Sequence, residues 1–314
     1  MFTHAPVLLN EVLESLSLDD HRDGVFIDAT FGRGGHSAAI LQCLNDQGRL
    51  VALDRDPAAI AAGREQFKTE ARLSLVHCAF AQLNVALSAA GMGDTSEKIS
   101  GALFDLGVSS PQLDEAVRGF SFMRDGPLDM RMDNSTGISA AEWVAKISER
   151  DLQNIISEYG EERFARRIAN AIVSYRREQP ITTTTQLAEL IDAAVPTREP
   201  GKHPATRTFQ AIRIAVNAEL EQIQYALNQV IEMLAPGGRL CVISFHSLED
   251  QLVKQFMQAH SQDDPMYAGL PSIPADKRAK LKRIGKAIHP GDAEVRRNPR
   301  ARSAILRVAE KVAA

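Results

Sequence analysis

A short strand, a glycine-rich turn and a helix follow one another between residues 25 and 44, and few folds accommodate that order. Val25–Asp28 has the apolar run of a buried strand, and Phe31-Gly32-Arg33-Gly34-Gly35 supplies the turn after it. Residues 36–44 then place apolar side chains at helical spacing, and Arg49–Asp54 is a second apolar strand. This order is typical of the first strand–helix–strand unit of a parallel sheet.

The same alternation continues as far as about residue 106. Pro57 occupies the favoured first-turn position of a helix expected over 58–67. Further apolar strands are expected at 73–78 and 101–106. The sequence therefore predicts an α/β fold with a parallel, doubly wound sheet.

The alternation stops near residue 111, and helical patterns replace it until about residue 206. They lie at 140–146, 150–157, 162–175 and 185–194. One long helical pattern then runs from 208 to 234, and strands are expected at 239–245 and 304–309. A chain of 314 residues is long enough for about two domains. We therefore expect a sheet domain, built from residues 1–112 and 207–314, that is interrupted by an all-helical domain at 113–206.

Composition excludes several classes of protein. Hydrophobic residues make up 44% of the chain and charged residues 24%, which is ordinary for a globular domain. Cys43, Cys78 and Cys241 form no CxxC pair, and the eight histidines form no HxxxH or HxH pair, so neither a disulfide nor a metal site is expected. No apolar stretch approaches about 18 residues and no basic leader precedes one, so we expect a cytoplasmic protein without a membrane anchor.

An aspartate ends three of the predicted strands: Asp28, Asp54 and Asp105. Parallel strands bring their carboxyl ends to one edge of the sheet, where ligands of such folds bind. Asp54 lies 20 residues after Gly34, where an acidic side chain can accept from the hydroxyls of a ribose. A helix N-cap is the ordinary alternative for each aspartate alone, but three together predict a ligand site.

The charges of this site favour S-adenosylmethionine over a dinucleotide. Ser37 stands where the dinucleotide fingerprint Gly32-Arg33-Gly34-Gly35-His36-Ser37 would need Gly or Ala. A pyrophosphate would lie close to the acidic Asp28, whereas the sulfonium and amino groups of S-adenosylmethionine are cationic and are attracted by carboxylates. Pro236-Gly237-Gly238 resembles the turn before the fifth strand of class I methyltransferases. A nicotinamide oxidoreductase on the same fold is the alternative.

Several longer motifs recur as a set in one family. They are His4-Ala5-Pro6-Val7-Leu8-Leu9, Asp28-Ala29-Thr30-Phe31-Gly32-Arg33-Gly34-Gly35-His36-Ser37, Asp105-Leu106-Gly107-Val108-Ser109-Ser110-Pro111-Gln112-Leu113-Asp114, His203-Pro204-Ala205-Thr206-Arg207-Thr208-Phe209-Gln210, Ser244-Phe245-His246-Ser247-Leu248-Glu249-Asp250 and Asn298-Pro299-Arg300-Ala301-Arg302-Ser303. Together they resemble the MraW/RsmH family, the bacterial 16S ribosomal RNA (cytosine-1402-N4)-methyltransferases. The similarity extends from about residue 4 to residue 308.

This resemblance implies a class I, Rossmann-like, S-adenosylmethionine-dependent methyltransferase sheet with an inserted helical substrate-recognition domain. It implies methylation of the exocyclic N4 amine of a cytosine in the decoding region of 16S rRNA, with the RNA as partner within the small ribosomal subunit. By the same resemblance, the residues that hold the cofactor are Gly34, Gly35, His36, Asp54 at the ribose, Phe80 at the adenine, Asp105 and Gln112. A non-catalytic ribosome-assembly factor that retains the cofactor pocket is the alternative function.

The catalytic assignment rests on position. Cytosine N4 is a poor nucleophile, so an enzyme must hold it in line with the methyl group and accept a hydrogen bond from the amine. Asp105, or a backbone carbonyl of the turn at 106–109, is our candidate acceptor. The Ser/Asp-Pro-Pro-Tyr motif of DNA amino-methyltransferases is absent, and Asp105-Leu106-Gly107-Val108 stands in its place. No thiol is placed for attack on the ring.

The net charge of −4 conceals a strongly basic segment. Residues 277–302 carry ten Lys and Arg against two acidic residues, a net charge of +8, which leaves −12 for the rest. We expect RNA contacts from Arg118, Arg207, Arg300 and Arg302, with a merely solvated surface as the alternative. Phe120 and Phe122 are candidates to stack on a base, although core packing is the more ordinary role for both. The sequence leaves a homodimer open.

Overall fold

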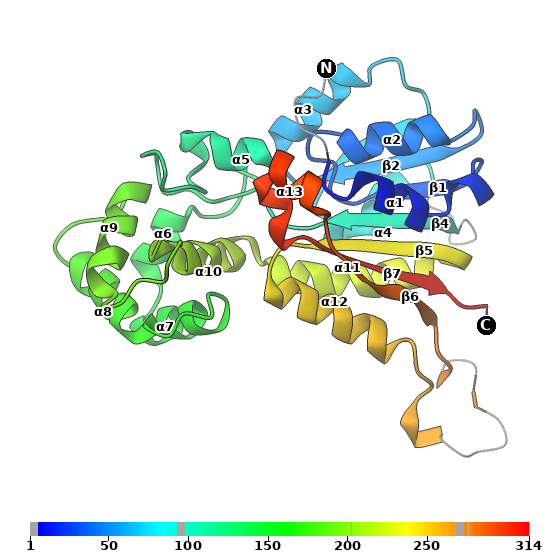
Figure 1. Cartoon of the computed structure of the whole chain (residues 1–314). Coiled ribbons are helices and arrows are strands. Elements are labelled where there is room, and N and C mark those ends of the chain that lie inside the picture. Colours follow the sequence, from blue (N-terminus) through cyan, green and yellow to red (C-terminus); the bar gives the residue numbers. More distant parts are fainter. Residues whose placement is uncertain (1–5, 93–97, 202, 268–272, 275–276, 314) are drawn as a thin grey trace. The chain divides into compact units, whose positions relative to one another are not determined.

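The structure is a computed structural model of the chain, and it describes residues 6–92, 98–201, 203–267, 273–274 and 277–313 (Figure 1). The chain forms two compact units, one from residues 1–107 and 220–314, the other from residues 108–219. The second unit begins five residues before the predicted insert and ends thirteen residues after it. The later end has a physical reason, because Ala205, Phe209 and Ile212 are buried in the core of the helical unit.

The first unit is built on a seven-stranded sheet in the order β3-β2-β1-β4-β5-β7-β6. Its strands are β1 (Val25–Asp28), β2 (Arg49–Asp54), β3 (Leu73–His77), β4 (Ile99–Asp105), β5 (Leu234–Ser244), β6 (Leu281–Ile288) and β7 (Ile305–Lys311). The predicted α/β class is confirmed, and β1 to β5 are parallel as expected. The last two strands differ, because β7 runs antiparallel to both β5 and β6 and makes the sheet mixed.

Helices cover both faces of this sheet (Figure 1). They are α1 (Leu9–Ser15), α2 (Gly35–Cys43), α3 (Pro57–Gln66), α4 (Leu83–Ala89), α11 (Glu219–Met233), α12 (Ser247–Ala259) and α13 (Asp292–Arg297). Successive strand residues point to opposite faces. Phe26, Leu50 and Leu103 therefore pack with α1 and α2, whereas Ile27, Val51 and Phe104 pack with α4, α11 and α12. Burial on both faces explains why these strands are continuous apolar runs.

The long helix predicted over 208–234 is wrong, because the chain forms two helices there. One residue, Ala218, separates helix α10 (Ala205–Asn217) from α11, and it has a left-handed backbone with φ of 50°. Alanine is not a helix breaker, and the apolar periodicity of the sequence continues through residue 218. The sequence therefore gives no sign that the helix breaks there. The first α-helix residue after the break also marks the boundary between the two units.

The second unit is helical, as predicted. Besides α10 it contains α5 (Ser110–Asp114), α6 (Ala140–Lys146), α7 (Glu149–Glu158), α8 (Ala165–Tyr175) and α9 (Thr184–Ala194). The side chains of Ser139, Ser148 and Thr183 cap α6, α7 and α9 by accepting backbone N–H groups of the first turn. The apolar stripes of these helices share one core, to which Leu152, Ile168 and Leu187 contribute.

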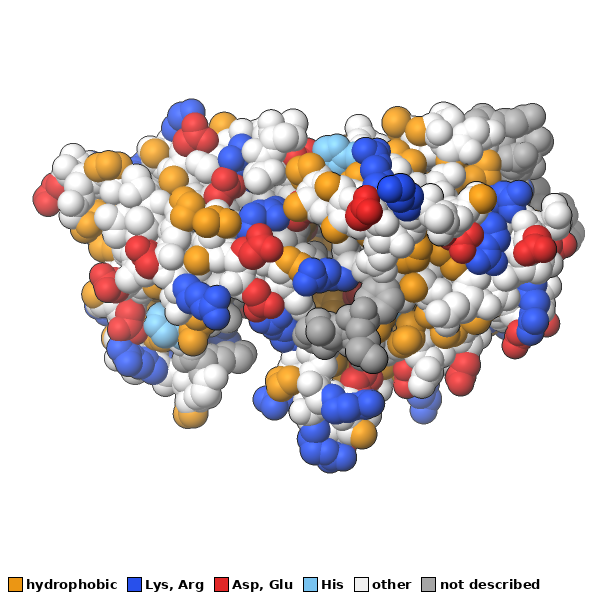
Figure 2. Space-filling model, turned by 90° about the horizontal axis from the view of Figure 1, so that it is seen from above, with side chains coloured by type: hydrophobic (Ala, Val, Ile, Leu, Met, Phe, Trp, Pro, Cys, Tyr) orange, Lys and Arg blue, Asp and Glu red, His pale blue; other side chains and the backbone are white. Residues whose placement is uncertain are grey.

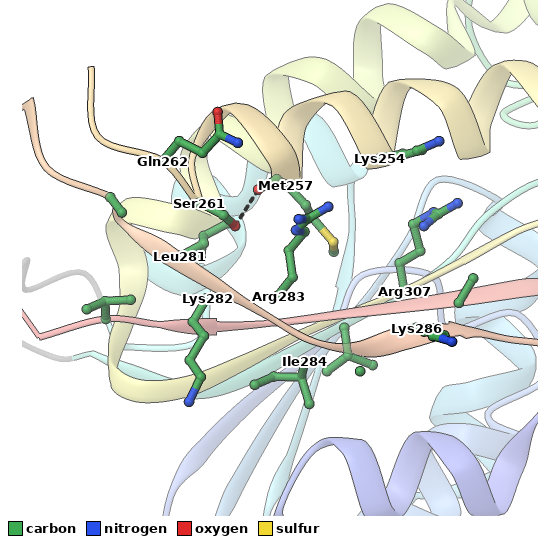
Figure 3. Close-up of a pocket in the computed structure, with 15 residues that line it drawn as sticks. Lys254, Met257, Ser261, Gln262, Leu281, Lys282, Arg283, Ile284, Lys286 and Arg307 are labelled. Carbon is green, nitrogen blue, oxygen red and sulfur yellow. Dashed lines mark hydrogen bonds between the residues drawn. The ribbon is translucent and has the colours of Figure 1, made fainter. Parts of the chain in front are cut away.

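Two features of the surface bear on the function. Lys and Arg side chains lie among Asp and Glu side chains over most of the face that Figure 2 shows. On the first unit, α12 lies beside the edge of the sheet that β6 forms. Figure 3 shows Arg283 of β6 and Arg307 of β7 pointing toward α12 and Lys282 of β6 pointing away from it. Among the described residues, no helix is both long enough and apolar enough to span a bilayer.

Candidate functional site

The carboxyl ends of the parallel strands bring the three predicted aspartates to one edge of the sheet. Asp28 is level with Ala52 on β2, and Asp54 is the last residue of that strand. Asp105 ends β4, whose neighbour is β1. The sequence placed these carboxylates together because it identified all three strands and their direction correctly.

Asp28 fixes the turn after β1. Its side chain is 1% exposed, and its two oxygens accept hydrogen bonds from the Ser37 hydroxyl at 2.6 Å and from the Thr30 N–H at 3.2 Å. Burial raises the pKa of Asp28 to about 6, although both hydrogen bonds act in the opposite direction. Ser37 thus has a structural purpose at the position where a dinucleotide site would need Gly or Ala.

Asp54 holds the glycine turn from the other side. Its Oδ2 accepts the Gly32 N–H at 2.7 Å and its Oδ1 accepts the Asp56 N–H at 2.8 Å. Burial raises the pKa of this carboxyl to about 6. Each carboxylate oxygen has a further lone pair, so Asp54 can still accept from a ligand hydroxyl.

Asp105 and His36 lie next to each other in the site. His36 Nε2 lies 3.0 Å from the carbonyl oxygen of Val7, and because a carbonyl only accepts, Nε2 must carry a hydrogen. The other ring nitrogen, Nδ1, lies 3.6 Å from Asp105 Oδ2, which is an ion-pair distance and too long for a hydrogen bond.

The other oxygen of Asp105, Oδ1, is buried and has no hydrogen-bond partner among the described residues. The backbone of Asp105 is fixed, since its N–H donates to Thr30 Oγ1 at 2.7 Å. Burial raises the pKa of Asp105 to about 6, the charge of His36 lowers it, and the carboxylates of Asp28 and Glu249 raise it. A quarter of the Asp105 side chain remains exposed, but Oδ1 itself does not, so Oδ1 is a buried acceptor whose hydrogen-bonding capacity is unfilled.

This edge fits a cationic ligand and not a pyrophosphate. Three carboxylates converge there, and each has its pKa raised by burial. The unpartnered Asp105 Oδ1 matches an ammonium or amine donor, and Asp54 matches a ribose hydroxyl. An added phosphate would repel these charges. The donor set therefore fits S-adenosylmethionine, whose sulfonium and amino group are both positive.

Gly34 and Gly35 are required by the packing of the turn itself. A Cβ at Gly34 would lie 2.7 Å from the Phe31 ring and 2.8 Å from Phe67, and Gly34 has φ of 72°. A Cβ at Gly35 would lie 2.5 Å from Pro6. Packing alone therefore explains why both positions are glycine, with no ligand needed. The predicted backbone contacts of Gly34 and Gly35 with a cofactor stay a prediction.

Phe80 and Cys78, which both follow β3, bear on the predicted pocket. Phe80 begins a 3-10 helix and packs edge-on against Phe104, with ring centroids 6.1 Å apart. It follows the strand end by three residues, and its contact with an adenine stays a prediction. Cys78 is also close to this strand end, but burial raises its pKa to about 11, so at neutral pH it is a thiol and a poor nucleophile.

The N-terminal segment is part of the site, which the sequence did not reveal. Val7 orients His36 through its carbonyl, and Pro6 covers Gly35. Leu8 donates its N–H to Glu294 Oε1 of α13 at 2.8 Å. These contacts join segments 286 residues apart, and only the recurrence of the motif beginning at residue 4 hinted that the segment mattered.

Glu249 was also missed as a site residue. It is fully buried, its Oε2 accepts the Phe245 N–H at 2.8 Å, and its charge raises the pKa of Asp105. His246 precedes it as the N-cap of α12, where the imidazole accepts the Glu249 N–H. The signal in the sequence that could have found Glu249 is its place as an acidic residue inside the motif 244–250.

In the second unit, Gln112 belongs to a capping box. Its side chain accepts the Ser109 N–H at 3.0 Å and is 4% exposed, so it stabilises the start of α5. Its predicted contact with the cofactor stays a prediction.

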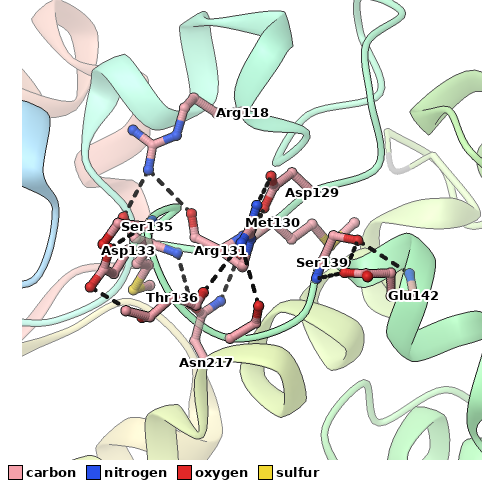
Figure 4. Close-up of polar contacts among 12 residues, drawn as sticks. Arg118, Asp129, Met130, Arg131, Asp133, Ser135, Thr136, Ser139, Glu142 and Asn217 are labelled. Atoms are coloured by element: carbon pink, nitrogen blue, oxygen red, sulfur yellow. Dashed lines mark hydrogen bonds and ion pairs between the residues drawn. The ribbon is translucent and has the colours of Figure 1, made fainter.

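Arg118 lies in a polar network within the second unit (Figure 4). Its guanidinium is 7% exposed and donates to the carbonyls of Arg131 and Met132, at 3.2 and 2.8 Å. Asn217 accepts the Met132 N–H at 2.8 Å and donates to the Met130 carbonyl at 2.7 Å. This network fixes the loop that precedes α6, so Arg118 supports the fold of the unit. Its predicted RNA contact is untested.

The other predicted RNA contacts lie on the surface. Arg207 forms an ion pair with Glu199 at 3.0 Å and keeps 31% of its side chain exposed. Arg300 and Arg302 are exposed on the 3-10 helix Pro299–Ser303 of the first unit. The packing alternative holds for the aromatic pair: Phe120 is buried, and Phe122 packs on His203 and Phe209.

Comparison with known proteins decides the family. The family model of the MraW methylases matches residues 1–312. The chain belongs to the MraW methylase family. It is 53% identical to the ribosomal RNA small subunit methyltransferase H of Neisseria meningitidis serogroup B, over 99% of this chain and 94% of that protein. It is 55% identical to the protein of that name from Chromohalobacter salexigens, over 99% and 92%. Membership of the family confirms the resemblance inferred from the motifs.

Solved structures of methyltransferases also align with this member of the family. An rRNA methylase from Streptococcus thermophilus aligns over 97% of this chain and 94% of its own, with a TM-score of 0.42 and 11% identity. The N-methyltransferase NodS from Bradyrhizobium japonicum, in complex with S-adenosyl-L-homocysteine, aligns over 98% and 89%, with a TM-score of 0.40 and 9% identity. The family assignment rests on the sequence relatives.

Proposed function

We propose that this chain transfers the methyl group of S-adenosylmethionine to the N4 amine of a cytosine, position 1402, in the 16S rRNA of the small ribosomal subunit. The observation that carries the proposal is Asp105, whose Oδ1 has no partner among the described residues and whose Oδ2 lies beside His36, at a carboxylate-rich sheet edge of a chain in the MraW methylase family. The relatives named ribosomal RNA small subunit methyltransferase H support the RNA substrate.

The residues of this edge would divide the binding of the cofactor between them. Asp54 would accept from the ribose, Phe80 would pack on the adenine, and the negative edge formed with Asp28 would attract the cationic end. Gly34, Gly35 and Gln112 would complete the pocket. S-adenosylmethionine supplies an electrophilic methyl group on a sulfonium, so these residues need only hold and orient it.

Asp105 would act on the substrate amine. Its Oδ1 can accept one N4–H, which turns the nitrogen lone pair toward the incoming methyl group. As the new N–C bond forms, the amine must lose a proton, and the carboxylate is the acceptor at hand. A pKa of about 6 makes Asp105 a stronger base than an ordinary carboxylate while it is still mostly ionised at pH 7. His36 would keep the carboxylate oriented.

Methyl transfer to isolated subunits tests this function. The chain is incubated with S-adenosylmethionine labelled in its methyl group and small subunits from a strain that lacks the enzyme, and the modified nucleotide is mapped by mass spectrometry. We expect label on N4 of a single cytosine. Free 16S rRNA in a parallel reaction shows whether the assembled subunit is needed.

Each other outcome has a distinct meaning. Tight binding of cofactor and subunit with no transfer of label would establish the non-catalytic assembly factor instead. Binding of NAD without binding of S-adenosylmethionine would establish the oxidoreductase. Label on a ring carbon or on another base would overturn the N4 assignment while leaving a methyltransferase.

A further inference from the structure

A pocket of about 760 Å³ lies on the first unit, between α12 and the edge of the sheet (Figure 3). Its basic lining residues are Lys254 on α12, Lys282, Arg283 and Lys286 on β6, and Arg307 on β7. Its apolar floor includes Met257, Leu281 and Val308, all of them buried. None of the fifteen described residues that line the pocket is acidic.

Four of the five cations have no neutralising partner in the described part of the chain. Arg307 is the exception, because it forms a two-pronged ion pair with Asp250 at 2.7 and 2.9 Å. The side chains of Lys254, Lys282, Arg283 and Lys286 are exposed and make no ion pair or hydrogen bond with any residue that the structure describes. Arg283 and Arg307 point toward α12, which bears Lys254, whereas Lys282 points away from it (Figure 3). Like charges that face one hollow repel one another, and a bound anion would relieve this repulsion.

The backbone of β6 contributes to the shape of the hollow. Ile284 pairs with Val308 and Ile288 pairs with Leu306, so four steps along β6 correspond to two along β7 and the strand bulges. Gly285 within the bulge has φ of 64°, and a Cβ there would meet no atom within 4 Å. Bulges at sheet edges redirect side chains and prevent further strand pairing. The pocket is therefore suited to a ligand held by side-chain charge and not to an added strand.

The pocket lies at the β6 edge of the sheet, away from the strands that bear the three aspartates. Lys282 pairs with Glu310 of β7, and Glu310 pairs with Arg239 near the beginning of the parallel run of β5. Ser244, at the carboxyl end of β5, is five residues further along that strand. At about 3.3 Å per residue, Lys282 is roughly 15 Å below that end, whereas Arg307, which pairs with Val242, is only two residues from it. The pocket is separated from the aspartates chiefly by the strand order, because β7 and β6 lie two and three strands beyond β4. The pocket is therefore a second site, separate from Asp28, Asp54 and Asp105.

We propose that this pocket, which we call the basic groove, binds the sugar–phosphate backbone of the substrate RNA. The proposal rests on the proposed function, since it assumes an RNA substrate. Unpaired Lys and Arg around an open hollow suit phosphates, and contacts of this kind position a nucleic acid without reading its bases. The apolar floor can accommodate ribose carbons. The basic groove would thus anchor RNA at a distance from the reacting cytosine.

Neutralising the groove tests the proposal against a matched control. The groove variant is Arg283→Gln with Lys286→Gln, and the control is Arg64→Gln with Lys68→Gln, two exposed cations at the end of α3 and just beyond it. Binding to small subunits is measured at several salt concentrations. We expect the groove variant to lower the slope of log K against log [salt] by about 1.5, since each phosphate contact contributes about 0.7–0.9. The control should keep the wild-type slope.

Further readouts separate a lost contact from a misfolded chain. The groove variant should bind S-adenosylmethionine as tightly as the wild type and keep its kcat, with a raised KM for the subunit. The exchanged variant, Arg283→Lys with Lys286→Arg, should restore most of the slope because it keeps both charges.

The outcomes also separate this proposal from the proposed function. If the wild type binds and methylates RNA and the groove variant matches it in slope and KM, the basic groove does not bind RNA. If a poly-glutamate peptide binds the wild type but not the groove variant, while RNA binding is the same for both, the ligand is an acidic protein segment and the proposal is overturned. A wild type that neither binds nor methylates the subunit contradicts the proposed function itself.

Discussion

The protonation state of Asp105 gives the candidate site its sharpest testable property. The carboxylate has one oxygen without a partner among the described residues and another at ion-pair distance from His36 Nδ1. An ionised Asp105 can accept from an amine, whereas a protonated one cannot. Activity should therefore depend on the state of this single carboxyl more than on any other group of the edge.

Replacing Asp105 by Asn should lower kcat by about 10²-fold or more, because the amide has no charge and cannot take a proton. Wild-type kcat should decrease as the pH drops below about 6, because the raised pKa of Asp105 is about 6. This decrease should be absent from the variant. Stopped-time assays of kcat between pH 5 and 8 measure both effects. Asp46→Asn, on an exposed turn, is the control.

The binding of the cofactor must be measured alongside. If Asp105→Ala kept the wild-type turnover and lost only affinity for S-adenosylmethionine, the catalytic role of Asp105 would be wrong, and a backbone carbonyl of the turn at 106–109 would be the remaining candidate.

Asp28 should make the unliganded chain less stable as pH rises. Its pKa is about 6 in the folded chain, against 3.8 for an ordinary aspartate, so the folded state holds a proton that the unfolded state has already lost. The stabilising contribution is present below about pH 4 and is lost as pH rises through 6. The shift corresponds to about 3 kcal/mol at most.

Urea unfolding at pH 4.5 and pH 7.5 measures this contribution. In Asp28→Asn, the free energy of unfolding should fall by less between these two pH values than in the wild type, by about 2 kcal/mol, because part of the contribution is already lost at pH 4.5. An equal pH dependence in both chains would show that Asp28 is not buried as an acid. Such a cost at neutral pH is expected where a site keeps carboxylates ready for a cationic ligand.

Among the elements, the break between α10 and α11 is the clearest case of a feature that the sequence concealed. Ala218 adopts φ of 50°, which costs an L-residue roughly 1–2 kcal/mol and a glycine almost nothing. The break is compensated in part by Asn217, whose side chain binds the loop at Met130 and Met132.

Ala218→Gly should therefore raise the free energy of unfolding by about 1 kcal/mol, as measured by denaturant titration. Ala62→Gly, at an exposed position inside α3, is the matched control and should lower it by about 1 kcal/mol. A loss of stability in Ala218→Gly would contradict the strain assigned to this residue.

The elements that the sequence predicted well are those with apolar runs or caps. The span predicted for β2 is the observed one, and α6 begins and ends where it was expected. Strand β6 was missed because an edge strand that carries Lys282, Arg283 and Lys286 has no apolar run. The three aspartates were found because strand direction alone brings them together. Thr30, Val7 and Glu249 were not, since their roles depend on contacts between distant segments.

Over the whole molecule, the net charge of −4 says little about partners, because charge is unevenly distributed along the chain. Arg300 and Arg302 are exposed on one segment of the first unit, and the basic groove lies on another. Elsewhere, basic and acidic side chains are interspersed on the face shown in Figure 2. Such a surface favours RNA at a few places and disfavours indiscriminate binding.

Neutralising Arg300 and Arg302 to Gln should reduce the slope of log K against log [salt] for binding to small subunits, by about 1.5 if both contact phosphates. Combined with the groove variant, the two reductions should add, because the residues belong to separate elements. Filter binding across a range of salt concentrations measures this. An unchanged slope would mean that these arginines are only solvated surface.

The contact between Leu8 and Glu294 has a consequence for the order in which the chain matures during translation. The helical unit is one continuous segment, so it is complete as soon as residue 219 has been synthesised. The sheet unit must wait, because β7 lies between β5 and β6 and the segment bearing Val7 is tied to α13. On a nascent chain the segment that orients His36 through Val7 can therefore be held by Glu294 only after α13 has been synthesised, later than the last residue of the helical unit.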